Sequence, residues 1–436
     1  MAKKQPLEKE YDVIVVGTGP AGSTIAHRTS QAGMKVLILE KGAYHPEWLL
    51  GKQIPSLLLF DKFGLCTTKE GLTVARCITV GGTAVMSCGS ASLPYPGMFE
   101  KAGLDLKEEL EEAHGYMGIV DDFPDGLVGK NQLRLMEVAN GLGYNFRKSK
   151  KFIDPAKCDG GACMKGCPNG AKWSGRVPVE SARQCGAHLL TGAEVVRTIL
   201  EQGEAVGVET KRGDKYYGKS VVLSAGGLAS PLILMKSGIK GVGDKFGVDP
   251  LRVTYGFSKE NPTVRDIDMG IVDDAYHESD GLILSPLVHT WLSYLAAAAE
   301  GGSYLPGLWK FGRAVGIMTK IKDDLGGAIY GDGSFSKPLT KSDWSKLDKG
   351  EEHASRILKA AGCTDIFSCR PGAAHPCASV RVGDHVDANF ETGIKNLFVC
   401  DASVFPESMG LPCVWTCTAL GLRMAKVLKK RFNVAG

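Results

Sequence analysis

The sequence predicts an α/β protein with two packed domains, of which the first is discontinuous along the chain. Three observations lead to this expectation. The chain has 436 residues, more than one hydrophobic core usually supports. It opens on a strand–turn–helix–strand pattern over residues 11–39. It closes on a strand and an amphipathic helix over residues 396–430. We therefore expect a Rossmann-like domain that the chain leaves and later completes, together with a smaller α+β domain.

The opening unit is defined by its glycines and β-branched residues. A strand of mostly β-branched residues leads into a glycine turn, and a helix ended by Gly33 leads to a second apolar strand. The expected ranges are strand Tyr11–Val16, turn Gly17–Gly22, helix Ser23–Ala32 and strand Lys35–Leu39. Later elements follow from polar turns between apolar runs: strands Ala193–Ile199, Ala205–Glu209, Tyr216–Ser224 and Asn396–Cys400, and helices Leu228–Ser237 and Thr416–Lys430.

Composition excludes several classes of protein. The net charge of +4 is weak for this length and argues against nucleic-acid binding, which needs a concentrated basic face. No secretory signal is visible, so a cytoplasmic protein is expected. The apolar stretch 282–299 contains Pro286 and His289, which favours a buried core segment over a transmembrane span. Thirteen cysteines, an odd number, suggest reduced, catalytic or metal-bound thiols rather than a disulfide framework.

The turn fits the GxGxxG pattern in the correct context. Gly17 permits the tight turn, Gly19 lets backbone approach a pyrophosphate, and Gly22 lets helix and strand pack closely. The helix N-terminus then offers free N–H groups and a positive dipole end to phosphate. Glu40, at the end of the next strand, would accept hydrogen bonds from ribose hydroxyls and disfavours NADP. The motif by itself does not separate FAD from NAD.

Further segments resemble one family across nearly the whole chain. Val80–Thr83 is similar to a second glycine motif, and Val221–Gly227 with Ser230-Pro231 is similar to an "AAG…SP" signature. Asn396–Pro406 is similar to a C-terminal "NL.V.DaSvfP" segment. Together these segments resemble the glucose–methanol–choline (GMC) oxidoreductases. The resemblance implies bound FAD and oxidation of a CH–OH group by hydride transfer to the flavin.

The resemblance also assigns the cofactor residues. Gly17, Gly19, Gly22 and Glu40 would hold the ADP half, and the backbone of Val196 would contact the adenine region. The residues expected near the pyrophosphate and the isoalloxazine are Gly81, Gly82, Thr83 and Asp401. Small residues at Ala225 and Gly226 would let backbone approach a large planar cofactor.

His375 matches the family's flavin-facing histidine in position. Histidine suits the removal of a hydroxyl proton because its ordinary pKa lies near neutrality. The alternative is a structural loop histidine. The sequence departs from the family at Pro412, where a second His or Asn is usual, and proline has no side-chain donor or acceptor. Cys413 or Ser408 could substitute, or the enzyme could act on a different bond.

Cys158, Cys163 and Cys167 lie within ten residues and are separated by glycines. Three interpretations stay open: an iron–sulfur cluster completed by a fourth thiolate, a structural zinc site, and unligated or disulfide-bonded cysteines. Cys66, Cys77 and Cys88 are candidates for the fourth ligand. The spacing matches no common ferredoxin pattern, although a cluster would give a flavin dehydrogenase an exit for single electrons.

The expected boundaries are 9–98, 180–250 and 388–436 for the FAD-binding domain, 99–179 for a connecting region with the cysteine-rich loop 158–167, and 251–387 for the substrate domain. The second domain is short for the family, but Gly316–Asp324, Gly326–Tyr330 and Leu347–Gly362 resemble its strands and long helix. Its scattered aromatic residues could line a pocket, although core packing is the commoner role: Trp291, Tyr294, Tyr304, Trp309 and Phe311.

We therefore expect a flavoprotein that oxidises an alcohol, sugar or polyol and passes electrons to an external carrier. No second nucleotide motif is present for NAD(P)H, which favours an electron-carrier protein or a partner subunit as acceptor. One alternative is a flavin-dependent reductase of C=C or C=O bonds fed by a ferredoxin-like donor. Another is a non-catalytic flavin subunit that relays electrons within a complex.

Overall fold

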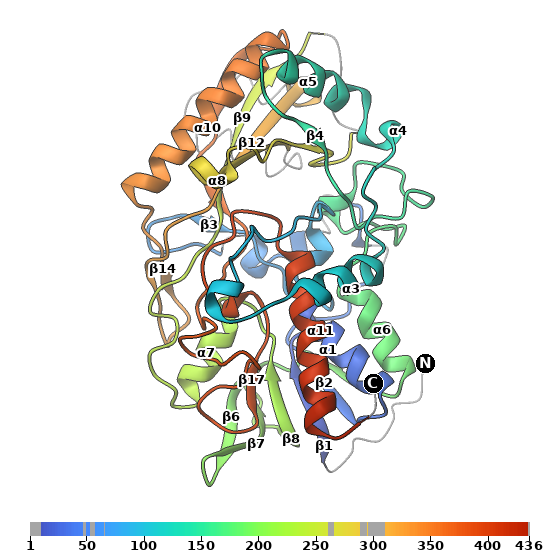
Figure 1. Ribbon diagram of the computed structural model, residues 1–436, viewed down its shortest axis with the longest axis vertical. Coiled ribbons are helices and arrows are strands. Elements are labelled where there is room, and N and C mark those ends of the chain that lie inside the picture. Colours follow the sequence, from blue (N-terminus) through green and yellow to red (C-terminus); the bar gives the residue numbers. More distant parts are fainter. Residues whose placement is uncertain are drawn as a thin grey trace.

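A computed structural model of the chain describes residues 10–46, 49–52, 57–64, 66–259, 266–287, 294 and 310–434. Two packed parts lie one above the other along the longest axis of the molecule (Figure 1). The lower part is a seven-stranded sheet with helices against it, and the upper part is a six-stranded sheet with one long helix against it. The prediction of an α/β fold with a discontinuous Rossmann-like domain and a second domain is confirmed.

The seven-stranded sheet has the order β5–β2–β1–β8–β7–β6, and β17 also pairs with β8. The pairs among β1, β2, β5, β8 and β17 are parallel, whereas the pairs β6–β7 and β7–β8 are antiparallel. Both β7 and β17 fit beside β8 because β7 pairs with Lys215–Tyr217 and β17 pairs with Val221–Leu223. The strands are β1 Tyr11–Val16, β2 Val36–Glu40, β5 His188–Thr191, β6 Val195–Glu201, β7 Glu204–Thr210, β8 Lys215–Leu223 and β17 Leu397–Val399.

The two ends of the described chain meet in this lower part. Helix α1 (Pro20–Gln31) packs against α11 (Val414–Arg431), and each buries most of its residues. α6 packs on α1, and α3 packs on α11 (Figure 1). This part also contains α3 Lys107–Met117, α6 Arg176–Gln184 and α7 Ala229–Lys236, whereas α4 Asp125–Val128 and α5 Lys130–Gly141 lie in the upper part.

The upper sheet has the order β11–β12–β9–β16–β3, with β15 also beside β9. Its pairs are antiparallel except β16 with β3. The long helix α10 (Lys341–Ala360) packs on β9, β11 and β12. The strands and remaining short elements are β3 Thr73–Val74, β4 Arg147–Lys148, β9 Pro250–Phe257, β10 Ile271–Val272, α8 His277–Asp280, β11 Leu282–Pro286, β12 Ala314–Ile321, β13 Ala328–Ile329, β14 Phe335–Ser336, β15 Thr364–Ser368 and β16 Gly372–Ala373.

Two expected elements of this part differ from the structure. α10 begins before Leu347 because Thr340 and Asp343 form a reciprocal capping box at its N-terminus. The strand expected at Gly326–Tyr330 shortens to β13, which pairs with β14 outside the main sheet. Of the proposed pocket aromatics, Tyr294 and Phe311 pack together with ring centroids 5.1 Å apart in a buried cluster, as core residues do. Trp291, Tyr304 and Trp309 lie outside the described residues.

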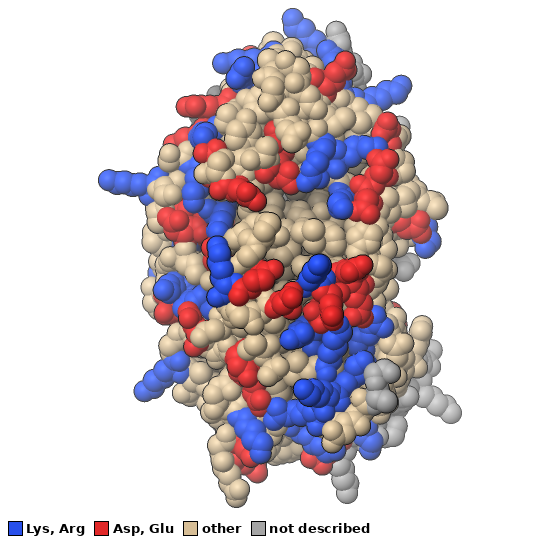
Figure 2. Space-filling model, in the orientation of Figure 1, with Lys and Arg blue, Asp and Glu red and all other residues tan. Residues whose placement is uncertain are grey.

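Charges of both signs are interspersed on the face that Figure 2 shows. Basic side chains gather beside α11, with acidic side chains of α3 next to them. Lys426 of α11 lies 2.7 Å from the buried Glu109 carboxylate of α3, so this basic group is partly neutralised. No helix in the described ranges is both long and apolar enough to cross a membrane.

Candidate functional site

The glycine turn after β1 has the geometry that its motif predicts. Gly17 has a φ of 102°, and a Cβ there would lie 2.3 Å from the Ser224 carbonyl oxygen. A Cβ on Gly22 would lie 2.3 Å from the Gly17 carbonyl oxygen. At Gly19 a Cβ would meet no atom within 4 Å, and α1 begins there without a side-chain cap. The turn therefore presents open space in front of the N-terminus of a twelve-residue helix, and pyrophosphate binding there stays a prediction.

Glu40 ends β2 and supports this turn. Its Oε2 accepts hydrogen bonds from the Thr18 backbone N–H at 3.0 Å and from the Thr18 hydroxyl at 2.5 Å. Its Oε1 accepts one from the Gly42 N–H at 2.7 Å. Burial raises the pKa of Glu40, although these hydrogen bonds oppose the shift. The carboxylate thus organises the turn in addition to any contact with a ribose.

The second glycine motif lies against the first. The Gly81 N–H donates to the Thr18 hydroxyl oxygen at 2.9 Å, and a Cβ on Gly82 would lie 2.8 Å from Gly19 Cα. The Thr83 hydroxyl accepts a hydrogen bond from the Cys77 N–H at 3.1 Å, which fixes the start of the following turn. Thr18, an unspecified position of the motif, therefore links both glycine motifs with Glu40, and sequence reasoning did not single it out.

Asp401 joins the end of β17 to the segment after β8. Its Oδ2 accepts hydrogen bonds from the Gly226 N–H at 2.8 Å and the Ser230 hydroxyl at 2.5 Å, and its Oδ1 accepts from the Ser403 N–H at 2.7 Å. A Cβ on Gly226 would meet nothing within 4 Å, so open space lies there too. Ala225 is held by its N–H donating to the Ser230 hydroxyl.

Val196 lies in β6, and it has no paired residue in the register with β7. The register passes from Val195 opposite Thr210 to Arg197 opposite Glu209, so Val196 lies at an irregularity in the ladder. Its backbone is therefore placed for another partner, and the adenine contact stays a prediction.

His375 follows β16 and lies beside these segments. A Cβ on Gly227 would lie 2.0 Å from the Pro376 carbonyl oxygen, which shows how closely the two segments approach. The Ala378 N–H donates to the Ala402 carbonyl at 3.0 Å, and the Ser379 hydroxyl donates to the Gly227 carbonyl at 2.6 Å. The segment that contains His375 thus packs between the segments that follow β8 and β17, which carry Gly226 and Asp401.

The ring of His375 contacts a buried ion pair. Its Nδ1 lies 3.1 Å from Asp249 Oδ2 and 3.0 Å from Lys320 Nζ, and these two charged atoms are 3.3 Å apart. Asp249 and Lys320 are 1% and 2% exposed, whereas the His375 side chain is 24% exposed. Burial would raise the pKa of Asp249, but Lys320 and His375 outweigh it and hold that pKa well below its ordinary value.

A second buried ion pair continues the network. Ser408 donates to Asp249 Oδ1 at 2.7 Å and lies 2.6 Å from Asp323 Oδ1. Lys337 Nζ lies 2.9 Å from Asp323 Oδ2. The Gly410 N–H also donates to Asp249 Oδ1, at 2.9 Å. The segment after Asp401 thus fixes the carboxylate that contacts His375.

Pro412, Cys413 and Ser408 lie in the segment where the resemblance expects a second His or Asn. Ser408 is committed to the two aspartates. Cys413 occupies the N-cap position of α11 without a side-chain capping hydrogen bond. A hydrogen bond from Cys417 lowers the pKa of Cys413 to about 6 although burial opposes this.

The predicted metal ligands are not assembled as ligands. Within the described ranges, no group of three or more His, Cys, Asp or Glu side chains is placed to hold a metal ion. The loop is held by the buried Lys172, whose Nζ donates to the carbonyls of Cys163, Val85 and Ser87 at 2.6, 2.9 and 2.5 Å. The described part of the structure therefore does not support the metal site expected at Cys158, Cys163 and Cys167.

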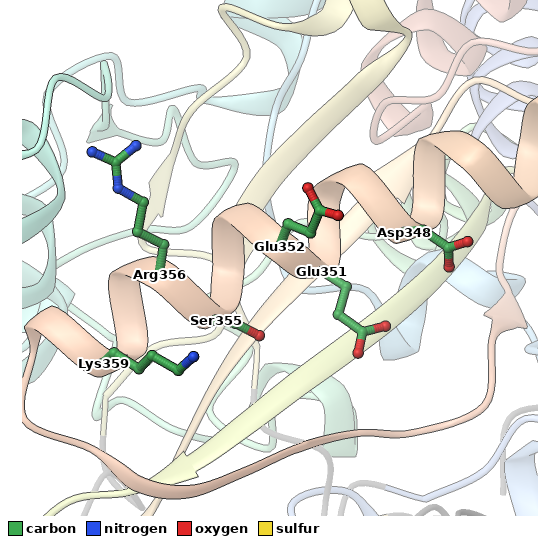
Figure 3. Close-up of a pocket in the computed structure, with 6 residues that line it drawn as sticks. All are labelled: Asp348, Glu351, Glu352, Ser355, Arg356 and Lys359. Carbon is green, nitrogen blue, oxygen red and sulfur yellow. The ribbon is translucent and has the colours of Figure 1, made fainter.

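A separate depression lies on the exposed face of α10 (Figure 3). Only charged side chains and one serine of that helix line it: Asp348, Glu351, Glu352, Ser355, Arg356 and Lys359. It includes none of the predicted site residues, and side chains from a single helix enclose no ligand.

Family comparisons match most of the chain. The model of the GMC oxidoreductase N-terminal region matches residues 11–250, and that of the C-terminal region matches residues 336–421. A protein of Methanocaldococcus jannaschii is 26% identical over 95% of this chain and 99% of its own. A long-chain-alcohol oxidase of Arabidopsis thaliana is 26% identical over 92% of this chain, which spans 65% of the oxidase.

Solved structures share the fold at low sequence identity. A pyridoxine 4-oxidase from Mesorbium loti superimposes with a TM-score of 0.75 and 17% identity, over 96% of this chain and 99% of its own. A variant of Aspergillus oryzae formate oxidase, studied for modification of its FAD, superimposes with a TM-score of 0.77 and 15% identity, over 98% of this chain and 100% of its own.

Proposed function

The chain belongs to the GMC oxidoreductase family, and on that premise we propose that it binds FAD and oxidises a CH–OH group of an alcohol, sugar or polyol. Bound FAD supplies the acceptor for the hydride that leaves carbon. His375 takes the hydroxyl proton, and electrons then pass to an external carrier. Support for the cofactor comes from the open spaces at Gly19 and Gly226 and from the close approach of the two glycine motifs.

The position of His375 carries this proposal. Its segment packs between Gly227 and Ala402, next to the glycines and Asp401 expected at the flavin. Among the described residues, hydrogen-bond partners reach only its Nδ1, so Nε2 is the nitrogen available to substrate. A base must come within hydrogen-bond reach of the proton that it removes, and this partly exposed ring is placed for that.

The family does not define the donor. By their names, the relatives act on long-chain alcohols, pyridoxine and formate, which are chemically different. The second candidate, reduction of a C=O bond, needs an acid with its proton on Nε2. The ammonium of Lys320, 3.0 Å from Nδ1, can only donate and favours that tautomer, whereas the carboxylate of Asp249, 3.1 Å from the same nitrogen, favours the opposite one.

Anaerobic half-reactions separate the two directions. FAD-loaded protein is mixed with a panel of alcohols, sugars and polyols, and bleaching of the flavin absorbance is followed. We expect one class to bleach the flavin and His375→Ala to slow this by about 100- to 10,000-fold. His385→Asn, which changes a half-buried histidine bonded to the Gly241 carbonyl, is the control and should keep the wild-type rate.

Bleaching by an alcohol at an unchanged rate in His375→Ala would contradict the role of His375. Failure of every alcohol, combined with reoxidation of the reduced protein by an aldehyde or ketone, would instead support the reductase.

A further inference from the structure

We propose that the Asp249–Lys320 ion pair selects the tautomer of His375, placing its proton on Nδ1 and leaving Nε2 as the base. This inference rests on the proposed function, since it concerns how the same histidine is prepared for its role. Asp249 and Lys320 act through His375 and are positioning residues.

The two contacts at Nδ1 favour opposite tautomers of the His375 ring. Asp249 Oδ2, 3.1 Å away, can only accept, so it requires a proton on Nδ1. Lys320 Nζ, 3.0 Å away, can only donate while it is charged, so it requires a lone pair there. A single nitrogen in the ring plane cannot satisfy both at once.

The contact with Asp249 determines the tautomer of His375, because Lys320 has other acceptors. The ammonium can turn its N–H groups toward Asp249 Oδ2 at 3.3 Å and the Asp249 carbonyl at 3.4 Å. The imidazole has no such freedom. A lone pair on Nδ1 would face the carboxylate lone pairs at 3.1 Å, which is repulsive in a buried site.

The carboxylate is held where it is needed. Asp249 has a φ of 48°, a left-handed conformation that costs energy and persists only where the surroundings enforce it. Ser408 and Gly410 occupy its Oδ1, which leaves Oδ2 for His375 and Lys320. Lys320 comes from β12, in register with Leu251 of β9, so neighbouring strands deliver both partners.

Lys320 has a second effect, which is electrostatic. Its charge holds the pKa of Asp249 well below its ordinary value, so the carboxylate stays ionised and remains an acceptor for the N–H at Nδ1. Cys413, at the start of α11, also interacts electrostatically with His375, and the Asp323–Lys337 pair reaches Asp249 through Ser408.

The chain contains a matched control for this pair. Lys337 and Asp323 form an ion pair with nitrogen and oxygen 2.9 Å apart, with side chains 1% and 0% exposed. Ser408 joins that pair to Asp249, yet its described contacts do not include His375. Replacing Lys337 therefore removes a buried positive charge, as replacing Lys320 does, but leaves the contacts at Nδ1 of His375 unaltered.

The test follows flavin reduction against pH in single-turnover, anaerobic experiments on FAD-loaded protein. Asp249→Asn removes the anion, so we expect the half-maximal pH to fall by about one unit, and the plateau rate to fall at least tenfold. Lys320→Met removes the cation, so we expect the half-maximal pH to rise by about one unit. Lys337→Met, whose contacts do not include His375, should move it less than Lys320→Met does.

Nitrogen-15 NMR of histidine-labelled protein gives a readout that does not depend on turnover. The His375 signals are identified by their loss in His375→Gln. We expect a protonated Nδ1 and an unprotonated Nε2 in the wild type and in Lys337→Met, and a mixture of tautomers in Asp249→Asn. Should Lys320→Met not fold, Lys320→Gln removes the charge and keeps a donor, and the same upward shift is expected.

Shifts of opposite sign cannot come from general loosening of the site. A proton on Nε2 in the wild type, or one half-maximal pH shared by all variants, would overturn the inference. If His375→Ala alone abolished flavin reduction while Asp249→Asn and Lys320→Met kept the wild-type profile and tautomer, the proposed function would stand and this inference would fall. If His375→Ala reduced flavin normally, the proposed function would fall, and the NMR result would still decide the tautomer.

Discussion

The carboxylate of Glu40 is buried, although it has to accept hydrogen bonds from the glycine turn and, in the proposed function, from a ribose. It is 7% exposed and accepts three hydrogen bonds from Thr18 and Gly42. An ionised carboxylate at that position costs desolvation, which these donors only partly offset, so its pKa is raised. A ribose hydroxyl needs the ionised form as acceptor.

From this conflict we predict a pH dependence of FAD binding. A raised folded-state pKa means that the stability contributed by Glu40 is fully present below its unfolded-state pKa and is lost as pH rises through the folded-state pKa. FAD binding has the opposite sign, because protonation removes an acceptor, so affinity should fall as pH falls through the raised pKa. Titration by FAD fluorescence quenching between about pH 5 and 8 measures this.

Glu40→Gln should weaken binding by roughly tenfold and flatten the pH dependence, because the amide does not titrate in this range. Glu201→Gln, at the exposed end of β6, is the control. A wild-type affinity that is constant over this pH range would contradict the prediction.

Site residues that belong to a local sequence motif were predictable. Site residues that are distant in sequence and come together only in the folded chain were not. The glycine turn, Glu40 and His375 were assigned from the sequence and its family resemblance. Asp249 and Lys320 lie 126 and 55 residues from His375 along the chain, and no short pattern marks either one. A buried lysine and aspartate look like surface residues in a sequence until strand pairing brings them together.

At the scale of elements, the cysteine-rich loop is organised by a residue that the cysteine spacing does not mark. Three thiols among glycines are compatible with a metal site, but the side chain that organises the loop is Lys172. Its ammonium satisfies carbonyls of the loop and of the turn that follows the second glycine motif. No motif of the sequence marks this lysine for such a role.

We predict that Lys172→Met destabilises this connection. Carbonyls of Val85, Ser87 and Cys163 would lose a buried donor, and unsatisfied groups of this kind cost about 1–3 kcal/mol of unfolding free energy. Chemical denaturation measures this cost. Labelling with a thiol reagent, located by mass spectrometry, should show faster modification of Cys163.

Lys157→Met is the matched control, because it removes a lysine of the same loop whose only described ion pair is an exposed one with Asp154. Equal stability and equal labelling of Cys163 in the two variants would show that Lys172 does not hold the loop.

Capping and strand length explain why the start of α10 and the extent of β13 differ from the prediction. The reciprocal cap of Thr340 and Asp343 was a readable signal for the start of α10. The separation of β13 and β14 from the main sheet had no such signal, since a two-residue strand has no periodicity to read.

At the scale of the whole molecule, the chain completes its first domain only with its last helix. β17 pairs with the inner half of β8, and α11 packs on α1. The sequence predicted this return because family-like segments occur at both ends. It did not predict that β7 and β17 share one side of β8, because strand pairing depends on twist and register that no local pattern encodes.

The contact between α1 and α11 depends on one glycine, which gives the last prediction. A Cβ on Gly421 would lie 2.7 Å from the Ala21 carbonyl oxygen, a backbone atom that cannot move alone. Ala21 lies within the glycine turn motif. Gly421→Ala should therefore displace α11 from α1, lower the unfolding free energy by about 1–3 kcal/mol, and weaken FAD binding at the opposite end of the chain.

Gly115→Ala in α3 separates this effect from helix propensity. Gly115 is also inside a helix, but a Cβ there would meet nothing within 4 Å. That variant should be neutral or more stable by up to about 1 kcal/mol. Urea denaturation and FAD titration of both variants decide the matter. If Gly421→Ala behaved like Gly115→Ala in both measurements, the C-terminal helix would not control the geometry of the N-terminal cofactor turn.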